Sequence, residues 1–379
     1  MPAAIQIEPV TTPAQLDRFI SVADRINVGD PNYVPPLRME RRDALSSAKN
    51  PFFAHADVQL WIAVREGRDV GRISAQIDHL APVNPDGPDG HFGLISAEDD
   101  PDIFAALLRT AEDWLKARGC RRLLGPFNLS INEEVGLLID GFETPPMLMM
   151  GHDPAYTAAR MEAEGYVKVK DVYAYASSFD EDLPASVVRR VRRGPPQGLV
   201  LRPLDMKRYE AEVDALTGIL NDAWADNWGF TPVTDAETRQ LATAMKPVID
   251  PRLTWFAEID GEVAGFIVAL PNVNEAIGDL NGRLLPFGWA KLLWRLKVSR
   301  VKSVRIPLMG VKRRYAGTLR GAIAPFHLID NIRTQARLLG YQRCEMSWIL
   351  EDNAPMRGIL EALGAHVYKT YRIYQRTLT

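Results

Sequence analysis

Polar side chains suited to chemistry concentrate in one long loop in the first half of the chain. The loop spans residues 126–153 and carries an apolar Met-Leu-Met-Met run shortly before its single histidine. Polar residues gathered in a loop favour binding or catalysis over packing, although the methionines are also typical of a core. Carboxylates and imidazoles can take a proton from a reacting group. The loop supplies Asn128, Ser130, Asn132, Glu133, Glu134 and His152.

A second stretch offers the opposite charge. Residues 311–322 read VKRRYAGTLRGA, a basic and glycine-containing loop that leads into an amphipathic helix. A helix N-terminus has free N–H donors and a dipole that favours anions. The stretch has donors and positive charge suited to an anion, but a basic cluster is equally typical of a solvated surface, so the loop alone does not assign a site.

Other chemistries lack the residues they need. The two cysteines, Cys120 and Cys344, form no CxxC pair, so the sequence argues against a disulfide framework or a cysteine-rich zinc site and fits a reducing compartment. Both begin predicted strands, and we expect them in the core. No Ser-His-Asp arrangement or nucleophilic cysteine motif is visible, and we expect no metal site.

Composition is that of an ordinary globular protein. The 379 residues are 46% apolar and 25% charged, with a net charge of −3 that does not indicate a nucleic-acid binder. There is no run of about 18 apolar residues, and the N-terminus lacks the pattern of a signal peptide. We therefore expect a cytoplasmic location.

The elements that position these residues repeat along the chain. Residues 61–75 (WIAVREGRDVGRISA) and 255–269 (WFAEIDGEVAGFIVA) share alternating apolar runs around an acidic residue and a glycine, which predicts a β-hairpin in each. Two further patterns recur in the same order in both halves of the chain, and each predicts a helix, a glycine and a strand. Their glycines are Gly119 and Gly165 in the first copy and Gly340 and Gly364 in the second.

Three repeated sequence patterns in the same order predict two pseudo-repeated α/β domains, each with a mixed sheet, over residues 1–182 and 196–379. A charged and then Arg/Pro/Gly-rich linker joins them. Unequal spacing between matching glycines predicts an insert at 126–153 in the first copy and at 272–302 in the second.

The order of elements resembles the GNAT acyl-CoA N-acyltransferase fold, most closely over residues 306–376. In that family a strand ends in a valine, a glycine-containing loop opens a helix whose N–H groups bind the pyrophosphate of coenzyme A, and a later asparagine contacts the pantetheine arm. The resemblance implies tandem GNAT-like domains, with acyl-CoA as co-substrate and no permanently bound cofactor. The implied acyl-CoA contacts are Met309, Val311, Arg314, Gly317, Arg320, Gly321 and Asn353.

The match has departures. Ala316 and Leu319 stand where the family usually has a Gln or Arg and a first glycine. Leu360 replaces a frequent tyrosine acid, so a proton for the departing thiolate must come from elsewhere. Asn353 is also a good cap for the helix that follows it. The first copy is acidic where anions would bind, so we expect it to lack the cofactor and to shape the acceptor site.

Two segments suggest an apolar acceptor. Residues 216–237 concentrate aromatic and amide side chains, although tryptophans at helical spacing are also typical of a core. Residues 284–300 place Trp289, Leu292, Leu293 and Leu296 on one stripe, with basic residues beside it, as in a helix resting on an anionic membrane. The alternative is an amphipathic helix packed on its own domain. The acceptor contacts implied are Asn128, Ser130, Asn132, His152, Trp224, Asn227, Trp228 and Phe230.

Nearly the whole chain resembles the bacterial ceramide synthase group, notably in NYVPPLRMERRDAL, GPFNLSINEEVG and ADNWGF. The resemblance implies direct transfer of a fatty acyl group from acyl-CoA to the amine of a long-chain sphingoid base, 3-oxosphinganine. Backbone N–H groups near residues 309–311 would hold the oxyanion. A base must free the amine, and the candidates are Glu134, His55 and Glu345.

Two other classes stay open. One is a GNAT-type transferase for a small amine, or an aminoacyl-tRNA-dependent transferase, which would favour a broad basic face. The other is a non-catalytic acyl-CoA- or lipid-binding protein, which the altered phosphate loop would suit.

Overall fold

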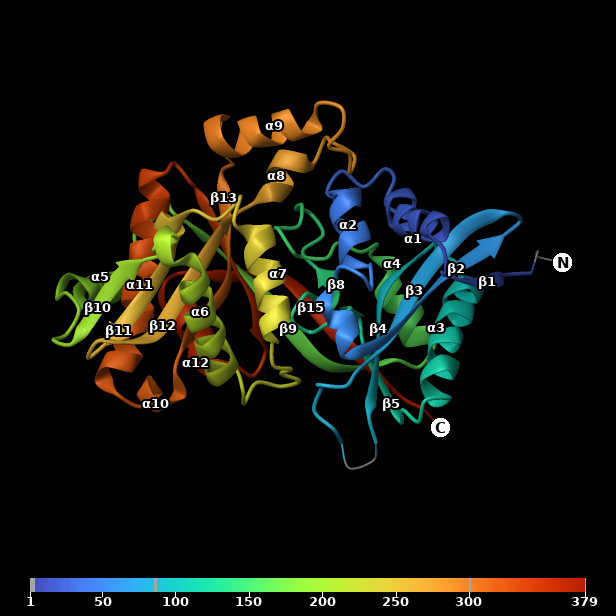
Figure 1. Ribbon diagram of the computed structural model, residues 1–379, viewed down its shortest axis with the longest axis horizontal. Helices are drawn as coiled ribbons and strands as arrows, with labels where there is room; N and C mark the ends of the chain where they lie inside the picture. The colour runs from blue at the N-terminus through green and yellow to red at the C-terminus, as the bar shows by residue number, and fades with distance from the viewer. Residues whose placement is uncertain (1–3, 85–86, 300, 379) are drawn as a thin grey trace. The chain divides into compact units, whose positions relative to one another are not determined.

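The computed structural model describes residues 4–84, 87–299 and 301–378 and divides the chain into two compact units (Figure 1). Unit 1 holds the described residues of 1–172, 277–288 and 369–379, and unit 2 holds those of 173–276 and 289–368. The predicted domains, 1–182 and 196–379, follow the sequence repeat. The compact units differ from these ranges, because each unit also contains short segments of the other repeat. Residue 300, the last of the predicted membrane segment, lies outside the described residues.

Unit 1 is a sheet with helices on both faces. The strands of the sheet are β1 (Gln6–Pro9), β2 (Ala56–Arg65), β3 (Arg68–Asp78), β4 (Asp89–Ala97), β5 (Arg122–Gly125) and β8 (Leu137–Asp140). The short strands β6 (Phe127–Asn128) and β7 (Glu134–Val135) pair with each other in a separate two-stranded sheet. Its helices are α1 (Pro13–Ile26), α2 (Arg38–Ala44), α3 (Pro101–Lys116) and α4 (Tyr156–Ala163). Strands β1 to β5 lie in that order, antiparallel except for the parallel pair β4 and β5.

Alternation along β2 builds two hydrophobic cores in unit 1. Leu60, Ile62 and Val64 pack in the core that includes Phe19 of α1. Trp61 and Ala63 pack in the other core, which includes the apolar face of α3. Successive side chains of a strand point to opposite faces, so a continuous apolar run is what a sheet covered on both faces requires.

Unit 2 repeats this plan. Its strands are β10 (Leu199–Pro203), β11 (Thr254–Ile259), β12 (Glu262–Pro271), β13 (Ser303–Val311) and β14 (Arg343–Leu350), again antiparallel except for the parallel pair β13 and β14. Its helices are α5 (Ala185–Arg192), α6 (Tyr209–Ala223), α7 (Asp235–Met245), α9 (Gly288–Trp294), α10 (Arg313–Ala316), α11 (Leu319–Leu338) and α12 (Ala354–Ala362). Helix α8 (Val273–Ile277) follows β12.

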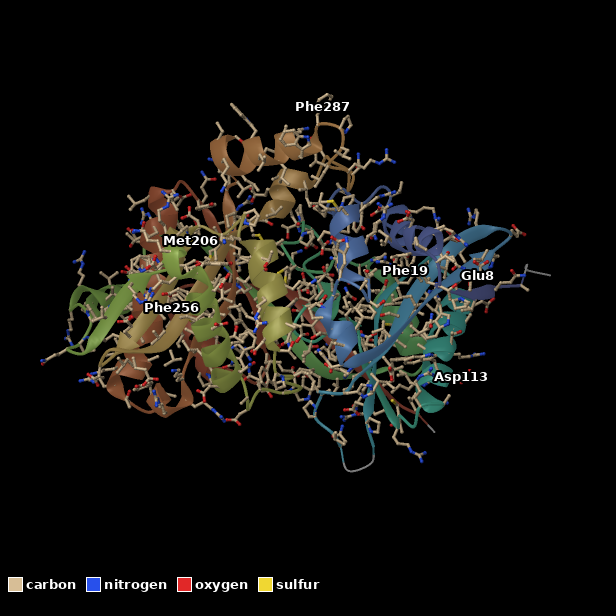
Figure 2. All side chains as sticks on the ribbon, viewed as in Figure 1. Glu8, Phe19, Asp113, Met206, Phe256 and Phe287 are labelled. Atoms are coloured by element: carbon tan, nitrogen blue, oxygen red, sulfur yellow. The ribbon has the colours of Figure 1, made fainter. Side chains whose placement is uncertain are left out.

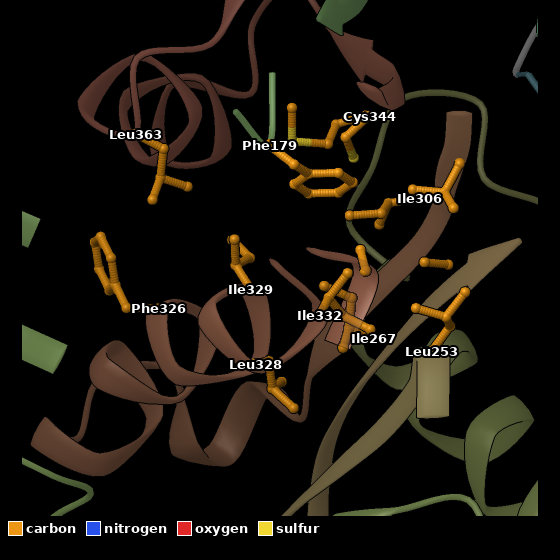
Figure 3. Packing of buried hydrophobic residues seen from close by; sticks show 14 of the residues in the cluster. Phe179, Leu253, Ile267, Ile306, Phe326, Leu328, Ile329, Ile332, Cys344 and Leu363 are labelled. Atoms are coloured by element: carbon orange, nitrogen blue, oxygen red, sulfur yellow. The ribbon is translucent and has the colours of Figure 1, made fainter. Parts of the chain in front are cut away.

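The core of unit 2 forms between the sheet and α11 (Figure 3). Ile329 and Ile332 of α11 face Ile267 of β12 and Ile306 of β13 in this core. Cys344 belongs to the same core, and Cys120 is equally buried in unit 1, which confirms the prediction that both cysteines pack. Burial raises the pKa of the Cys120 thiol to about 11.

The two predicted hairpins are present and their turns match. Glu66 and Gly67 join β2 to β3 with φ of 52° and 73°, and Asp260 and Gly261 join β11 to β12 with φ of 52° and 84°. Two successive residues with positive φ are what a two-residue type I′ turn needs, and glycine adopts such a φ without strain. Each hairpin also has a bulge at the same place in the pattern, between Ala63 and Val64 and between Ala257 and Glu258.

Two long strands carry the chain from one unit into the other. Strand β9 (Val167–Ser178) begins in unit 1, and its second half contributes Tyr175 to the core of unit 2. Strand β15 (His366–Thr377) begins in unit 2, and its second half contributes Tyr374 to the core of unit 1, where it pairs antiparallel with β5. The later part of each repeat's last strand therefore belongs to the other unit.

Residues 272–302 follow β12 and contain α8, α9 and a π-helical turn at Arg295–Ser299. None of the helices in the described ranges is long and apolar enough to cross a membrane.

Candidate active site

In unit 2, the parallel strands β13 and β14 are paired along only part of their length. Paired residues run from Ser303 opposite Arg343 to Ile306 opposite Met346. Beyond that point β13 continues to Val311 along β12, while β14 continues to Leu350 without pairing to β13. Pro307, which has no N–H to donate to a ladder, stands where the pairing ends. The divergence opens one side of β13 at the predicted contacts Met309 and Val311.

The start of α11 is a tight turn that needs a glycine. The Thr318 side chain caps the helix by accepting a hydrogen bond of 3.1 Å from the N–H of Gly321. A Cβ at position 321 would lie 1.9 Å from the carbonyl oxygen of Tyr315, so only glycine fits there without moving backbone. Gly317 has ordinary φ and open space around it, so its conformation does not require glycine.

The basic side chains of this loop face carboxylates. Arg320 pairs with Asp260, and Arg314 pairs with Glu262. The same holds for the remaining cations of the loop: Lys312 Nζ lies 2.7 Å from Glu262, and Arg313 Nη1 lies 2.9 Å from Asp226. The positive charge expected here is therefore largely balanced within the protein.

Asn353 caps α12. Its side-chain oxygen accepts a hydrogen bond of 3.1 Å from the N–H of Met356, as the capping alternative predicted. Leu360 of the same helix is buried in the core of unit 2, so this position offers no acid.

A buried polar group surrounds Glu345 on β14. The Ser347 hydroxyl donates to Glu345 Oε1 at 2.6 Å, Arg305 Nε lies 3.5 Å from the same oxygen, and the Tyr368 hydroxyl donates to Oε2. Arg305 also donates to Ser347 Oγ at 2.9 Å and stacks over the ring of Trp348. Glu345 is completely buried and Arg305 is 1% exposed. The carboxylate is thus held on both oxygens, and Tyr368 is the half-buried member of the group.

The aromatic segment lies near β13. The indole N–H of Trp224, at the C-terminus of α6, donates to the Met309 carbonyl at 3.3 Å. Asn227 and Phe230 belong to the turn that follows, and Trp228, like them, is half-buried. Of this predicted group, Trp224 has a hydrogen bond to the diverging part of β13.

In unit 1 the corresponding divergence is filled by the chain itself. Strand β5 pairs with β4 only as far as His91 opposite Leu124. The N–H of Leu94 then donates to the Asn128 side chain at 2.7 Å, and a Cβ at Gly93 would lie 1.8 Å from the carbonyl oxygen of Phe127. The N-terminus of α3 is capped by its own Asp100. Asn128 is therefore engaged with backbone in this unit.

A charged cluster in unit 1 surrounds Arg41 of α2. Arg41 pairs with Glu134, and the Asn128 amide donates to the other Glu134 oxygen at 2.8 Å. Burial opposes ionisation of Glu134, but Arg41 and Asn128 hold the pKa of this carboxyl below its usual value. Burial raises the pKa of neighbouring Glu133 to about 8. A second buried carboxyl, Asp153, has its pKa raised by burial to about 7.

The predicted histidines lie against aspartates in unit 1. His55 Nδ1 is 2.9 Å from Asp78 Oδ1, and His152 Nε2 is 2.8 Å from Asp30 Oδ2. Ser130 is buried, and its hydroxyl accepts from the N–H of Asn132 at 3.0 Å.

The predicted residues thus fall into two groups. Unit 1 holds His55, Glu134 and the loop residues, and unit 2 holds Glu345, the acyl-CoA contacts and the aromatic segment. Sequence reasoning missed the partners Arg41, Arg305 and Tyr368. Tyr368 had one available signal, because it is a polar residue within the last strand.

The predicted membrane stripe is divided between two environments. Leu292 and Leu296 pack against the core of unit 2, as the alternative interpretation expected. Trp289 and Leu293 are instead about half exposed, at 51% and 49%. Several residues of the segment outside the predicted stripe are more exposed. Among them are Trp294 at 61% and, in unit 1, Phe287 at 78%, whose side chain projects outward in Figure 2.

Comparison with known proteins identifies close relatives. The chain is 60% identical over 377 residues to the "Bacterial ceramide synthase" of Caulobacter vibrioides, covering 99% of this chain and 98% of that protein. It is 43% identical over 363 residues to "Protein YghO" of Escherichia coli, covering 96% and 93%. No protein-family model matches the chain.

Solved structures confirm the tandem GNAT fold. A tandem GNAT protein from the clavulanic acid biosynthesis pathway superposes with a TM-score of 0.59 at 14% identity, over 99% of both chains. A GCN5-related N-acetyltransferase from Sphaerobacter thermophilus superposes with a TM-score of 0.54 at 13% identity, over 99% of this chain and 96% of that one.

Proposed function

The chain belongs to the bacterial ceramide synthase group, and on this premise we propose that it transfers a fatty acyl group from acyl-CoA to the amino group of a long-chain sphingoid base, 3-oxosphinganine being the expected acceptor. The observation that carries the proposal is the 60% identity to a ceramide synthase over almost the full length of both proteins.

Acyl-CoA is assigned to unit 2. The diverging strands β13 and β14 leave room for an extended thioester, and the turn at Gly321 brings N–H groups to the start of α11, where a pyrophosphate is favoured. We assign Met309 and Val311 of β13 to the pantetheine and acyl side of this site. Asn353, which follows the end of the facing strand β14, is assigned to the pantetheine. Arg314, Gly317 and Arg320 are assigned to the phosphate side. The arginines would have to exchange their carboxylate partners for phosphate.

The acceptor is assigned in part to unit 1. Asn128 and the capping aspartate at α3 fill the positions that a second acyl-CoA would need, so this unit is better suited to another ligand. The ionised Glu134 can attract an ammonium group, and Glu134 and His55 are the base candidates of this unit. Within unit 1 the acceptor residues of the proposal also include Ser130, Asn132, His55 and His152. Within unit 2 we assign Trp224, Asn227, Trp228 and Phe230 to acceptor binding.

Transfer requires that a C–N bond form as the C–S bond breaks. The amine gives up a proton, and the coenzyme A thiolate must gain one. Position 360 has no acid, and we assign the second proton to Tyr368, whose hydroxyl is oriented by Glu345. Glu345 is then a positioning residue, because both of its oxygens are engaged.

Membrane contact is the remaining part of the proposal. A lipid amine is reached most readily at a bilayer surface, and the exposed Trp289, Leu293 and Trp294 lie on the same segment as Lys291 and Lys297. Aromatic and basic side chains together favour an anionic membrane interface. We propose that residues 284–300 make this contact peripherally.

One assay tests the proposed function. Purified protein is incubated with palmitoyl-CoA and a panel of amines that includes 3-oxosphinganine and small amines, and products are read by mass spectrometry. The N-acyl long-chain base is the expected product. Thiol release without amide would contradict acyl transfer, and amide formed only on small amines would contradict the lipid acceptor.

A further inference from the structure

A concave pocket of about 460 Å³ lies in unit 2, where α5 and the linker after it meet α11. We call it the α5 pocket. One wall comes from α5 and the linker, and the other from the second turn of α11. Its lining residues are Ser186, Arg189, Arg193, Gly194, Pro195, Pro196 and Ile323.

The arginines of the α5 pocket differ from the other cations near the start of α11. Arg314 and Arg320 are each paired with a carboxylate. Among the residues whose positions the structure describes, no carboxylate lies within ion-pair distance of Arg189 or Arg193, and both are exposed to solvent in the pocket. Two guanidinium groups in one concavity suit a phosphate, because each offers a planar fork of donors that matches phosphate oxygens.

The α5 pocket adjoins the turn assigned to the coenzyme A pyrophosphate. Ile323, on its wall, follows Gly321 by two residues. The linker also runs beside Arg320, because a Cβ at Gly198 would lie 2.9 Å from the Arg320 Cζ. Pro195 and Pro196 restrict the backbone between these points, which keeps the pocket wall in place with little entropy to lose on binding.

We propose that the α5 pocket binds the 3′-phosphate of coenzyme A, with Arg189 and Arg193 as the groups that hold it. The inference rests on the proposed function, since it takes acyl-CoA as the co-substrate of unit 2. In coenzyme A the 3′-phosphate and the pyrophosphate are attached to one ribose, so their two sites must be neighbours. The α5 pocket meets this condition and supplies unpaired positive charge.

The test compares coenzyme A with 3′-dephospho-coenzyme A, which differ only in this phosphate. Dissociation constants are measured by calorimetry for the full-length wild type, for the double variant Arg189→Ala/Arg193→Ala, and for Arg192→Ala. Arg192 is an exposed arginine of the same helix that does not line the pocket, so its variant shows the effect of losing one positive charge near the pocket. Thermal melting of each variant checks that it is folded.

The wild type should bind coenzyme A at least about tenfold more tightly than the dephospho form, as expected for charge-assisted hydrogen bonds. The double variant should bind both ligands alike, at the wild-type affinity for dephospho-coenzyme A, while Arg192→Ala keeps the preference. Equal wild-type affinities, or a preference lost equally in the Arg192 control, would overturn the inference and leave the proposed function standing. Wild-type protein that bound neither ligand would contradict the acyl-CoA assignment itself.

Discussion

Glu345→Gln removes the charge that faces Arg305 in the buried polar group of unit 2, and we expect a large loss of stability. Both side chains are almost completely buried, with Nε and Oε1 3.5 Å apart. Removing one partner of a buried ion pair costs about 3–5 kcal/mol. Arg305 keeps its hydrogen bond to Ser347 and its contact with Trp348, so we expect a loss of stability at the lower end of this range. For a folding unit of 150–250 residues, about 3 kcal/mol corresponds to a Tm fall of about 6–12 °C.

The assay is a double-mutant cycle read by differential scanning calorimetry. It compares Glu345→Gln, Arg305→Met and the combination, with Glu210→Gln as an exposed carboxylate control. The double variant should lose less free energy of unfolding than the sum of the losses in the two single variants, because it has no unpaired buried charge. A Glu345→Gln variant that melted with the control would refute the reasoning. Turnover measured well below the transition separates stability from any effect on Tyr368.

The other predictions concern protonation, the acyl-CoA turn and the membrane. Tyr368→Phe should lower kcat by about 10²-fold or more, since a general acid contributes about 10² to 10⁴. Its Tm should also fall, because Glu345 Oε2 loses this donor, so turnover is measured well below the transition. Unchanged kcat would remove Tyr368 from the mechanism. Burial raises the pKa of Glu133 to about 8 from its ordinary value of 4.5, so between these pH values the unfolded chain releases a proton that the folded protein keeps. Folding stability should fall as pH rises through that window, and less so in Glu133→Gln; parallel melting curves for the two proteins would contradict this. Gly321→Ala places a Cβ 1.9 Å from the Tyr315 carbonyl oxygen, and we expect the displaced turn to raise the KM for acyl-CoA at least several-fold, measured beside Gly317→Ala as the matched control with open space. Trp289→Ser/Trp294→Ser should weaken sedimentation with vesicles containing anionic lipid and leave activity on detergent-dispersed substrate unchanged, whereas undiminished sedimentation would exclude this segment as the contact.

The local elements could be predicted because their causes are local. The acidic residue and glycine of each hairpin turn adopt positive φ because the two-residue turn demands it. Thr318 and Asn353 cap helices through atoms three residues away. Such signals can be recognised within either copy of the sequence repeat. Their recurrence in both copies predicted the tandem fold that the solved structures confirm.

The polar partners could not be predicted, because sequence distance hides them. Arg41 and Glu134 are 93 residues apart, and Arg305 and Ser347 are 42 apart. Nothing near Glu134 indicates that an arginine lowers its pKa while burial raises that of Glu133, its neighbour in the chain. The charge of Arg41 acts on both carboxyls, but Glu134 also accepts hydrogen bonds from Arg41 and Asn128, and its pKa falls while that of Glu133 rises.

By itself, the sequence determined the repeat, the type and order of the elements, the strand-helix turn suited to an anion and the membership of the family. These follow from periodicity, turn chemistry and identity, which act over a few residues or require only alignment. Tertiary structure alone decided that the later part of each repeat's last strand belongs to the other unit, that β13 and β14 diverge, and that Arg189 and Arg193 meet in one pocket beside α11. Those features depend on side chains that are far apart in sequence and come together in a core or on a surface. Only in the folded protein do burial and neighbouring charges change the pKa and the stability contribution of such side chains.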